Sequence, residues 1–571
     1  MTSIGEALIG LLAARGVTLV FGIPGVHTIE LYRGLPGSNI RHITARHEQG
    51  AGFMADGYAR VSGMPGVVLV ISGPGVSNTL TPMAQARADS VPMLVLSGVS
   101  STQSLGRGFG HLHELPDQQA MVATVAISSR QIRSADDLLQ SVEHAFELFS
   151  QARGGPVHIE IPIDVMSLPF AQELTAPSAV TKQRRNNTSP LPDVLRAAKK
   201  PLILAGGGTR EAARQLLKLA ELLDAPVVQT VNARGLMHAH PLCVPASPSL
   251  AAVRELIADA DVVLALGTEL GPTDYDMYAD GGMPSLANLV RVDICHEQLA
   301  RHPAKETICG RVDAVLGEWL TVLEPVPVGV TGADRVTRPA SAAGSAYSVA
   351  PENTADAAGS ASRGARQHTT GAQRAGHTRQ AALQEIGQQM RLHVQLLEAI
   401  RSTIPNAILV GDSTQTIYAG NLYYDHDRPG GWFNAATGYG ALGYAIPAAI
   451  GASLADPATQ IVCISGDGGA QFSTNELMTA VDEQVPVLFL ICNNHGYQEI
   501  ATSMIAAGVP LQVCAPAPPD FQLLARACGI PWQACAMCPK ALATALSIAM
   551  KTLRSGNCPV IIELTMGKLD L

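Results

Sequence analysis

The sequence predicts an α/β protein made of three doubly wound domains, each built on a parallel sheet. Short apolar runs alternate with amphipathic helical patterns along most of the chain, which is typical of repeated strand–helix–strand units. The 571 residues correspond to about three domains of ordinary size. The composition agrees with large folded cores, because 47% of the residues are hydrophobic and 15% are charged.

Charge and hydropathy exclude several classes of partner. The formal net charge is −9, and no basic run with interleaved aromatic residues occurs, so a nucleic-acid surface is not expected. No apolar stretch reaches the length of a membrane span. The first residues indicate an amphipathic helix with a Ser3–Glu6 capping box rather than a secretory signal. We therefore expect a cytoplasmic protein without membrane or nucleic-acid partners.

The stretch 461–497 carries the clearest chemistry. An apolar strand ends in Ser-Gly-Asp-Gly-Gly, a helix follows with a Ser473–Glu476 capping box, and a second strand ends in Asn493-Asn494. Such a crossover makes the strands parallel, so Asp467 and Asn494 should face each other at the carboxyl edge of the sheet. Their oxygens suit Mg²⁺ carrying a diphosphate. Three glycines would let backbone N–H groups approach phosphate oxygens: Gly466, Gly468 and Gly469. Gly-Asp-Gly by itself also fits an ordinary turn with a capping aspartate.

An internal repeat links the two ends of the chain. Residues 67–97 follow the plan of residues 461–491: apolar strand, Ser-Gly-x-Gly, helix, Val-Pro, apolar strand. Pro74 stands where the later copy has Asp467, and no Asn-Asn closes the earlier copy. The sequence therefore predicts two similar domains, of which only the second can hold the metal.

Gly-Asp-Gly followed by Asn-Asn at this spacing resembles the thiamine diphosphate (ThDP) motif. The chain is similar to the acetolactate synthase-like superfamily of ThDP enzymes over nearly everything except residues of about 326–385. The resemblance implies ThDP and Mg²⁺ as cofactors. It also implies a homodimer or homotetramer, because relatives pair the first domain of one chain with the last domain of another. The expected units are a pyrimidine-binding domain (1–175), a Rossmann-like middle domain (190–325), a low-complexity linker (326–385) and a diphosphate-binding domain (386–571).

The same resemblance implies roles for individual residues. Glu48, within RHEQGAGFMADGYAR, would hydrogen-bond N1′ of the aminopyrimidine, although its position alone would make it a first-turn carboxylate that stabilises a helix dipole. The Gly440 carbonyl would accept a hydrogen bond from the 4′-amino group, and Leu442 would bend the cofactor into a V shape. The metal ligands would be Asp467, Asn494 and the Gly496 carbonyl.

Other candidate residues have open alternatives. The turn at Pro24-Gly25 could line the cofactor pocket or merely link a strand to a helix. Thr414 and Gln415 could bind the diphosphate or cap a helix. His27 and His113 are candidate proton donors, since histidine titrates near neutral pH, but surface histidines are common.

The middle domain is expected to lack FAD, which it holds in some relatives. Its Gly206-Gly-Gly208 turn is by itself weak evidence for a dinucleotide. Residues 267–276 also depart from the Arg-Phe-Asp-Asp-Arg-like segment that usually marks flavin binding.

The predicted activity is the non-oxidative decarboxylation of a 2-oxo acid. LHELPDQ and GDSTQTIYAGN are most similar to the 5-guanidino-2-oxopentanoate decarboxylases, a branch of the superfamily, which implies 4-guanidinobutanal and CO₂ as products. His113 could protonate the product, and Glu114 could pair with a cationic substrate tail. Acetolactate synthase, which joins two 2-oxo acids, is the alternative. A third possibility is an inactive regulatory subunit, against which the presence of Glu48, Asp467 and Asn494 argues.

Overall fold

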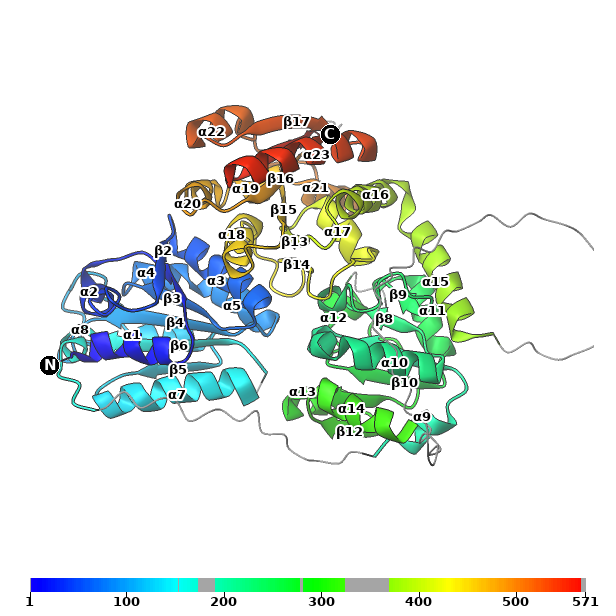
Figure 1. Ribbon diagram of the computed structural model, residues 1–571, viewed down its shortest axis with the longest axis horizontal. Helices are drawn as coiled ribbons and strands as arrows, with labels where there is room; N and C mark the ends of the chain where they lie inside the picture. Colours follow the sequence, from blue (N-terminus) through cyan, green and yellow to red (C-terminus); the bar gives the residue numbers. More distant parts are fainter. Residues whose placement is uncertain (1, 152, 173–189, 278–280, 324–368, 566–571) are drawn as a thin grey trace, which may run out of the picture.

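The computed structural model describes residues 2–151, 153–172, 190–277, 281–323 and 369–565 (Figure 1). Its strands form three six-stranded sheets, and all strand pairs within them are parallel. We call the units around these sheets the N-terminal body (2–172), the middle body (190–323) and the C-terminal body (387–565). This confirms the predicted fold class.

The N-terminal body has helices on both faces of its sheet (Figure 1). The sheet order is β2 (Arg41–Thr44), β1 (Leu19–Gly22), β3 (Gly66–Val70), β4 (Met93–Val99), β6 (Pro156–Pro162) and β5 (Ser128–Gln131). Its helices are α1 (Ile4–Ala14), η1 (Val26–Thr28), α2 (Ile29–Tyr32), α3 (Glu48–Ser62), α4 (Pro74–Asn78), α5 (Leu80–Ala88), α6 (Gln118–Ala123), α7 (Ala135–Gln151) and α8 (Ile163–Met166). The predicted capping box of α1 is present, with Ser3 and Glu6 each accepting the other's backbone N–H.

The C-terminal body repeats this strand order. Its sheet runs β14 (Trp432–Asn434), β13 (Ile408–Gly411), β15 (Ile461–Gly466), β16 (Val487–Asn493), β18 (Val560–Thr565) and β17 (Trp532–Ala536). Its helices are α16 (Gly387–Thr403), α17 (Gln415–Leu422), α18 (Ala445–Ala455), α19 (Asp467–Ala470), η4 (Thr474–Glu476), α20 (Leu477–Asp482), α21 (Gln498–Ala506), α22 (Phe521–Cys528) and α23 (Pro539–Gly556). Counted from the first strand of each body, both sheets have the order 2-1-3-4-6-5. The internal repeat in the sequence is therefore a repeat of topology.

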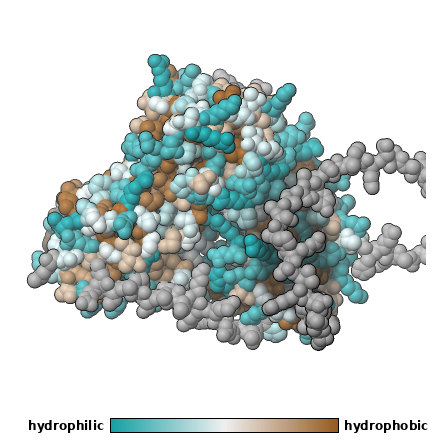
Figure 2. Space-filling view, viewed as in Figure 1, coloured by the Kyte–Doolittle hydropathy of each residue, from teal (hydrophilic) through white to brown (hydrophobic). Residues whose placement is uncertain are grey.

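The middle body has a different order, the classic Rossmann arrangement of two halves diverging from a central pair of strands. Its sheet runs β12 (Glu306–Cys309), β11 (Val290–Asp293), β10 (Val262–Leu266), β7 (Pro201–Ala205), β8 (Val227–Gln229) and β9 (Cys243–Val244). Its helices are α9 (Asp193–Ala197), η2 (Gly207–Ala212), α10 (Ala213–Leu223), η3 (Val231–Ala233), α11 (Ala251–Asp259), α12 (Pro272–Tyr275), α13 (His296–Ala300) and α14 (Val312–Leu323). In the view of Figure 2 this body is largely hydrophilic.

The predicted linker at 326–385 needs correction at its end. Residues 324–368 lie outside the described residues, but Gly371–Glu385 forms helix α15, opened by a capping box of Thr370 and Gln373. Ala375 and Ala382 are fully buried, and the Glu385 carboxylate accepts the first N–H groups of α11. The stretch contains few large apolar residues. Alanine side chains are large enough to fill this contact because α15 packs closely against the middle body.

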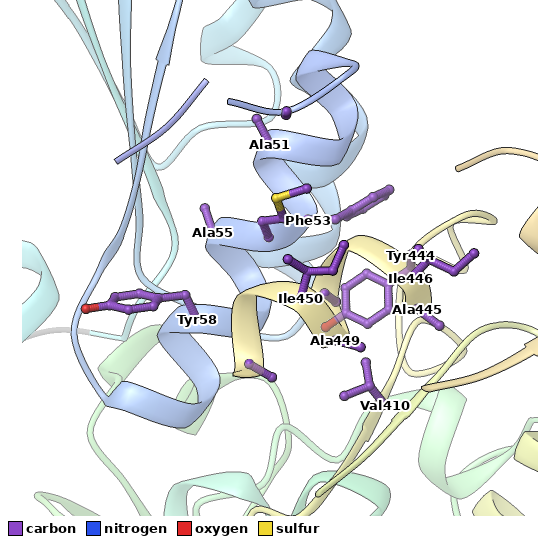
Figure 3. Close-up of a cluster of buried hydrophobic side chains, with 14 of the residues drawn as sticks. Ala51, Phe53, Ala55, Tyr58, Val410, Tyr444, Ala445, Ile446, Ala449 and Ile450 are labelled. Atoms are coloured by element: carbon purple, nitrogen blue, oxygen red, sulfur yellow. The ribbon is translucent and has the colours of Figure 1, made fainter. Parts of the chain in front are cut away.

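The N-terminal and C-terminal bodies share one core, formed where α3 crosses α18. Figure 3 shows apolar side chains from both helices meeting at this crossing: Ala51, Phe53, Ala55 and Tyr58 from α3, with Ala445, Ile446, Ala449 and Ile450 from α18. Two glycines permit the close approach. A methyl group at Gly57 would collide with the Ala448 carbonyl oxygen, and one at Gly451 would collide with the Met54 carbonyl oxygen.

None of the helices in the described ranges combines the length and apolar character that crossing a bilayer requires.

Replacing Gly451 with alanine should loosen the α3–α18 crossing, because the added methyl group meets backbone that cannot move aside. Overpacking of this kind costs about 1–3 kcal/mol, so Tm in scanning calorimetry should fall. Gly317→Ala is the matched control, since Gly317 lies within α14 with open space around it and alanine favours helix. Equal Tm values for wild type and Gly451→Ala would contradict the tight crossing.

Candidate active site

The structure brings Asp467 and Asn494 together at the carboxyl edge of the C-terminal sheet. Strands β15 and β16 are neighbours in register, and they end at Gly466 and Asn493. The Asn494 backbone N–H donates to Asp467 Oδ1 over 3.4 Å. Both side chains are buried. Their proximity follows from parallel strands that end side by side.

Three oxygen-bearing groups converge here: the Asp467 carboxylate, the Asn494 side chain and the Gly496 carbonyl. The Asn494 Nδ2 donates to Gln498 Oε1 over 3.0 Å. In that orientation its side-chain oxygen points at Asp467 Oδ1, 3.0 Å away, and at the Gly496 carbonyl oxygen, 2.8 Å away. Turning the amide over would convert those two contacts into N–H donations. The turned amide is the better hydrogen-bonded one, and it still contacts Gln498, whereas a cation bound between Asp467 and Gly496 would favour the orientation with the oxygen inward.

This oxygen set fits a hard cation. Oxygens facing one another without a proton between them repel, and a metal ion would turn that repulsion into attraction. Asp467 Oδ2 is buried without a hydrogen-bond partner, and burial raises the pKa of Asp467. Carboxylate, amide and carbonyl oxygens are ligands that Mg²⁺ accepts. Among the described residues no group of three or more His, Cys, Asp or Glu side chains is arranged for a metal.

The turn after β15 is packed so that only glycine fits at its centre. A Cβ atom on Gly468 would lie 2.5 Å from the Tyr497 ring, and one on Gly469 would lie 3.0 Å from the Asp412 carboxyl carbon. A Cβ on Gly466 would come within 3.2 Å of Thr414 Oγ1. Backbone N–H groups in such a turn can come close to an anionic ligand.

The neighbouring turn after β13 contributes hydroxyl and amide groups. Thr414 occupies the N-cap position of α17, but its side chain makes no capping hydrogen bond. Gln415 is buried and donates to Glu499 Oε2 over 2.9 Å. Asp412 is wholly buried, which raises its pKa to about 6, and it accepts N–H groups from Ser413 and from Ala445 at the start of α18. Asp412 therefore ties this turn to α18.

Glu48 is the first residue of α3, and its Oε2 accepts a hydrogen bond from Asn78 Nδ2 over 2.9 Å. In one copy of the chain this carboxylate thus bonds within the N-terminal body. Across the described ranges, no hydrogen bond joins Glu48 to the Asp467–Asn494 crevice.

Glu476 has a function that its sequence context did not indicate. Ser473 and Glu476 were expected to form a capping box, but Ser473 makes no capping hydrogen bond and its Oγ is buried without a partner. The fully buried Glu476 carboxylate instead crosses to the N-terminal body. There it accepts N–H groups from Arg46 over 3.1 Å and from His47 over 2.9 Å, directly before Glu48. A side chain at Gly50 would collide with it.

The two candidate histidines meet, although they lie far apart in the sequence. The rings of His27 and His113 pack edge to face, with centroids 5.3 Å apart. His27 Nδ1 hydrogen-bonds Ser72 Oγ, and burial, together with the nearby His113, lowers the pKa of His27. His113 has a left-handed backbone (φ +63°), and its Nδ1 is buried without a partner. The pair could relay a proton.

Glu114 differs from its expected role. Its carboxylate accepts backbone N–H groups from the four residues Gly108, Phe109, Gly110 and His111, over 2.7–3.2 Å. These hydrogen bonds lower the pKa of Glu114. The carboxylate holds its own loop in shape, so the prediction that it pairs with a substrate tail is not supported by its contacts.

The remaining predicted residues lie on turns and differ in exposure. Pro24 is exposed after β1, and a Cβ on the adjacent Gly25 would collide with Ile71. Gly440 is exposed with a left-handed backbone (φ +75°), and Leu442 is half-buried just before α18. Gly496 is buried, and a Cβ there would lie 2.6 Å from the Cys514 carbonyl oxygen.

Comparison with known proteins agrees with this geometry. The N-terminal, central and C-terminal domain models of the thiamine pyrophosphate enzymes match residues 2–121, 190–319 and 412–564. A probable 2-ketoarginine decarboxylase, AruI, from Pseudomonas aeruginosa is 41% identical over 536 residues, covering 92% of this chain and 88% of the relative. An acetolactate synthase from Mycobacterium bovis is 29% identical, covering 98% of this chain and 88% of the relative. The large subunit of acetolactate synthase isozyme 1 from Escherichia coli is 28% identical, covering 86% and 81%. With all three bodies matched in order, the chain belongs to the thiamine pyrophosphate (ThDP) enzyme family.

Proposed function

We propose that this protein decarboxylates a 2-oxo acid without oxidation, using ThDP and Mg²⁺, and that the substrate is 5-guanidino-2-oxopentanoate, which yields 4-guanidinobutanal and CO₂. The observation that carries the cofactor assignment is the oxygen set of Asp467, Asn494 and Gly496 beside a glycine turn. The substrate rests on the relative named as a probable 2-ketoarginine decarboxylase, since 2-ketoarginine is this guanidino 2-oxo acid.

Different residues of the chain would bind the metal, the diphosphate and the pyrimidine of the cofactor. When bound, ThDP supplies the carbon nucleophile and the electron sink for loss of CO₂. Asp467, Asn494 and the Gly496 carbonyl would hold Mg²⁺. Thr414, Gln415 and the glycine turn would hold the diphosphate. Glu48 would keep a proton at N1′ of the pyrimidine, the Gly440 carbonyl would orient the 4′-amino group, and Leu442 would support the bent conformation.

The pair of His27 and His113 would transfer the proton that the product requires. Its lowered pKa keeps His27 neutral at pH 7, so its ring can accept and pass on a proton. His113 lies against it with one buried ring nitrogen that has no hydrogen-bond partner among the described residues. Pro24 and Gly25 form the adjoining turn.

We further propose a homodimer or homotetramer in which Glu48 serves the Asp467 crevice of another copy. Glu48 does not bond to the crevice of its own chain. Large apolar side chains are also exposed on both outer bodies: Val26, Ile29, Phe109 and Leu112 on one, and Phe472, Ile500, Ile505 and Val513 on the other. A second copy would cover such surfaces.

Two further parts of the proposal concern the middle body and the location. We propose a middle body without FAD, so the purified protein should be colourless rather than yellow. All ten cysteines are free, which supports a reducing compartment such as the cytoplasm.

The activity is tested by incubating the purified protein with ThDP, Mg²⁺ and 5-guanidino-2-oxopentanoate. CO₂ and 4-guanidinobutanal should appear together, whereas pyruvate alone should give little acetolactate. Strong acetolactate formation from pyruvate would establish the alternative, an acetolactate synthase. Failure to turn over any of a panel of 2-oxo acids would favour an inactive regulatory subunit.

Replacing Glu48 with glutamine should slow exchange of the cofactor's C2 proton by about 100-fold or more, because the amide cannot share a proton with N1′. Affinity for ThDP should change little. The exchange is started in D₂O, stopped with acid at set times and measured by NMR. Glu30→Gln is the matched control, because Glu30 is a carboxylate of the same body that pairs with Arg33 on the surface. Exchange at the wild-type rate would exclude the proposed role.

Replacing Asp467 with alanine should instead weaken ThDP binding, because it removes the only charged metal ligand. A loss of more than about tenfold in affinity is expected at fixed Mg²⁺, measured by calorimetry. Asp482→Ala, at a partly exposed carboxylate that pairs with Arg46, is the control. Unchanged binding by Asp467→Ala would place the metal elsewhere.

A further inference from the structure

A single buried carboxylate joins all three bodies. Asp89, at the end of α5, accepts hydrogen bonds from Arg60 Nη2 (2.7 Å) and Gln85 Nε2 (2.9 Å) in its own body. It also accepts one from Asn232 Nδ2 of the middle body (3.2 Å) and one from Thr437 Oγ1 of the C-terminal body (2.9 Å). Only 2% of its side chain is exposed.

The surroundings make these hydrogen bonds strong. The Arg60 guanidinium is buried, donates to Asp56 Oδ1 over 2.6 Å and lies over the Phe433 ring, 5.3 Å from its centroid. Asp89 therefore meets a full positive charge where water is excluded. Hydrogen bonds to an ionised acceptor are about twice as strong as neutral ones.

The contact to Thr437 bears on the proposed cofactor site. Thr437 lies within hydrogen-bond distance of both Asp89 Oδ2 (2.9 Å) and the Asn434 carbonyl oxygen (3.0 Å), but it has one hydroxyl proton to donate. The charged acceptor is the stronger one. Thr437 therefore bonds to the N-terminal body.

Both ends of the loop 437–441 rest on α5. Beyond Thr437, a Cβ atom on Gly438 would lie 2.8 Å from Ala88 Cβ, and the Ala441 N–H donates to Gln85 Oε1 over 3.3 Å. Between these anchors lies Gly440, exposed and with a left-handed backbone. Residues of α5, together with the Ala435 carbonyl that accepts the Gly440 N–H over 3.1 Å, therefore fix the position of this loop.

We propose that Asp89 is a positioning residue, which through Thr437 holds the Gly440 carbonyl where it can accept the hydrogen bond from the aminopyrimidine of ThDP. This rests on the proposed function, since it requires ThDP as the ligand. Asp89 touches neither cofactor nor substrate. Its action differs from that of a simple clamp between bodies, because the Thr437 hydroxyl can be removed while Arg60, Gln85 and Asn232 stay bound to Asp89.

The test compares Thr437→Val with Thr437→Ser, which keeps the hydroxyl. Two ligands are titrated by calorimetry at fixed Mg²⁺. Inorganic pyrophosphate probes only the metal and diphosphate half of the site, whereas ThDP probes both halves. Thr459→Val is the matched control, because Thr459 also donates to a carboxylate, Asp456, in the same body.

Thr437→Val should bind pyrophosphate like wild type but bind ThDP about tenfold more weakly, the loss expected for one hydrogen bond. Thr437→Ser and Thr459→Val should match wild type for both ligands. Near-wild-type Tm values of the unliganded variants would show that the bodies remain joined.

Two results would overturn the proposal. An equal loss of affinity for both ligands in Thr437→Val would make its effect structural, and wild-type affinity for ThDP would show that the hydroxyl does not position the carbonyl. Failure of the wild-type protein to bind ThDP would overturn the proposed function itself, and this inference with it.

Discussion

The arrangement of the outer bodies depends on how closely α3 and α18 approach each other. Gly57 and Gly451 each face a backbone carbonyl of the opposite helix, where no side chain could fit. Proposed site residues lie at the ends of these helices: Glu48 begins α3, and the loop carrying Gly440 and Leu442 leads into α18. Because the crossing is backbone against backbone, a shift of either helix would move residues of the proposed cofactor sites. The glycines therefore govern the geometry of the site without belonging to it.

Apolar packing alone would let the two helices slide, and buried carboxylates remove that freedom. Glu476 reaches from the C-terminal body to the N–H groups of Arg46 and His47, while Asp89 reaches in the opposite direction to Thr437. A buried carboxylate that loses its hydrogen-bond donors costs free energy. Each of these two carboxylates therefore favours the alignment of the bodies in which its donors are present. The segment that carries Asp467 continues directly into Glu476, so Glu476 links the turn at Asp467 to the start of α3 within one chain.

Much of the fold and part of the site could be predicted because the governing interactions are local. Strand–helix–strand units dictate parallel strands, which is why Asp467 and Asn494 could be expected at one edge. The errors arise where distant groups compete with local ones. Ser473-x-x-Glu476 has the pattern of a local cap, but N–H groups of another body take its carboxylate. Glu114 was expected to be able to pair with a substrate tail, and its sequence context did not reveal that its own loop offers four donors. The meeting of His27 and His113 depends on the path of two loops, which no periodicity reveals.

The two outer sheets share one strand order, and the turn after the third strand holds Pro74 in one and Asp467 in the other. If both turns carried an acid, a metal-bound phosphate could bind at either of the two outer bodies. With proline on one side, a long and asymmetric ligand of the proposed kind would have its metal-bound end at the C-terminal body alone. The direction of such a ligand would then follow from a difference between two repeated units.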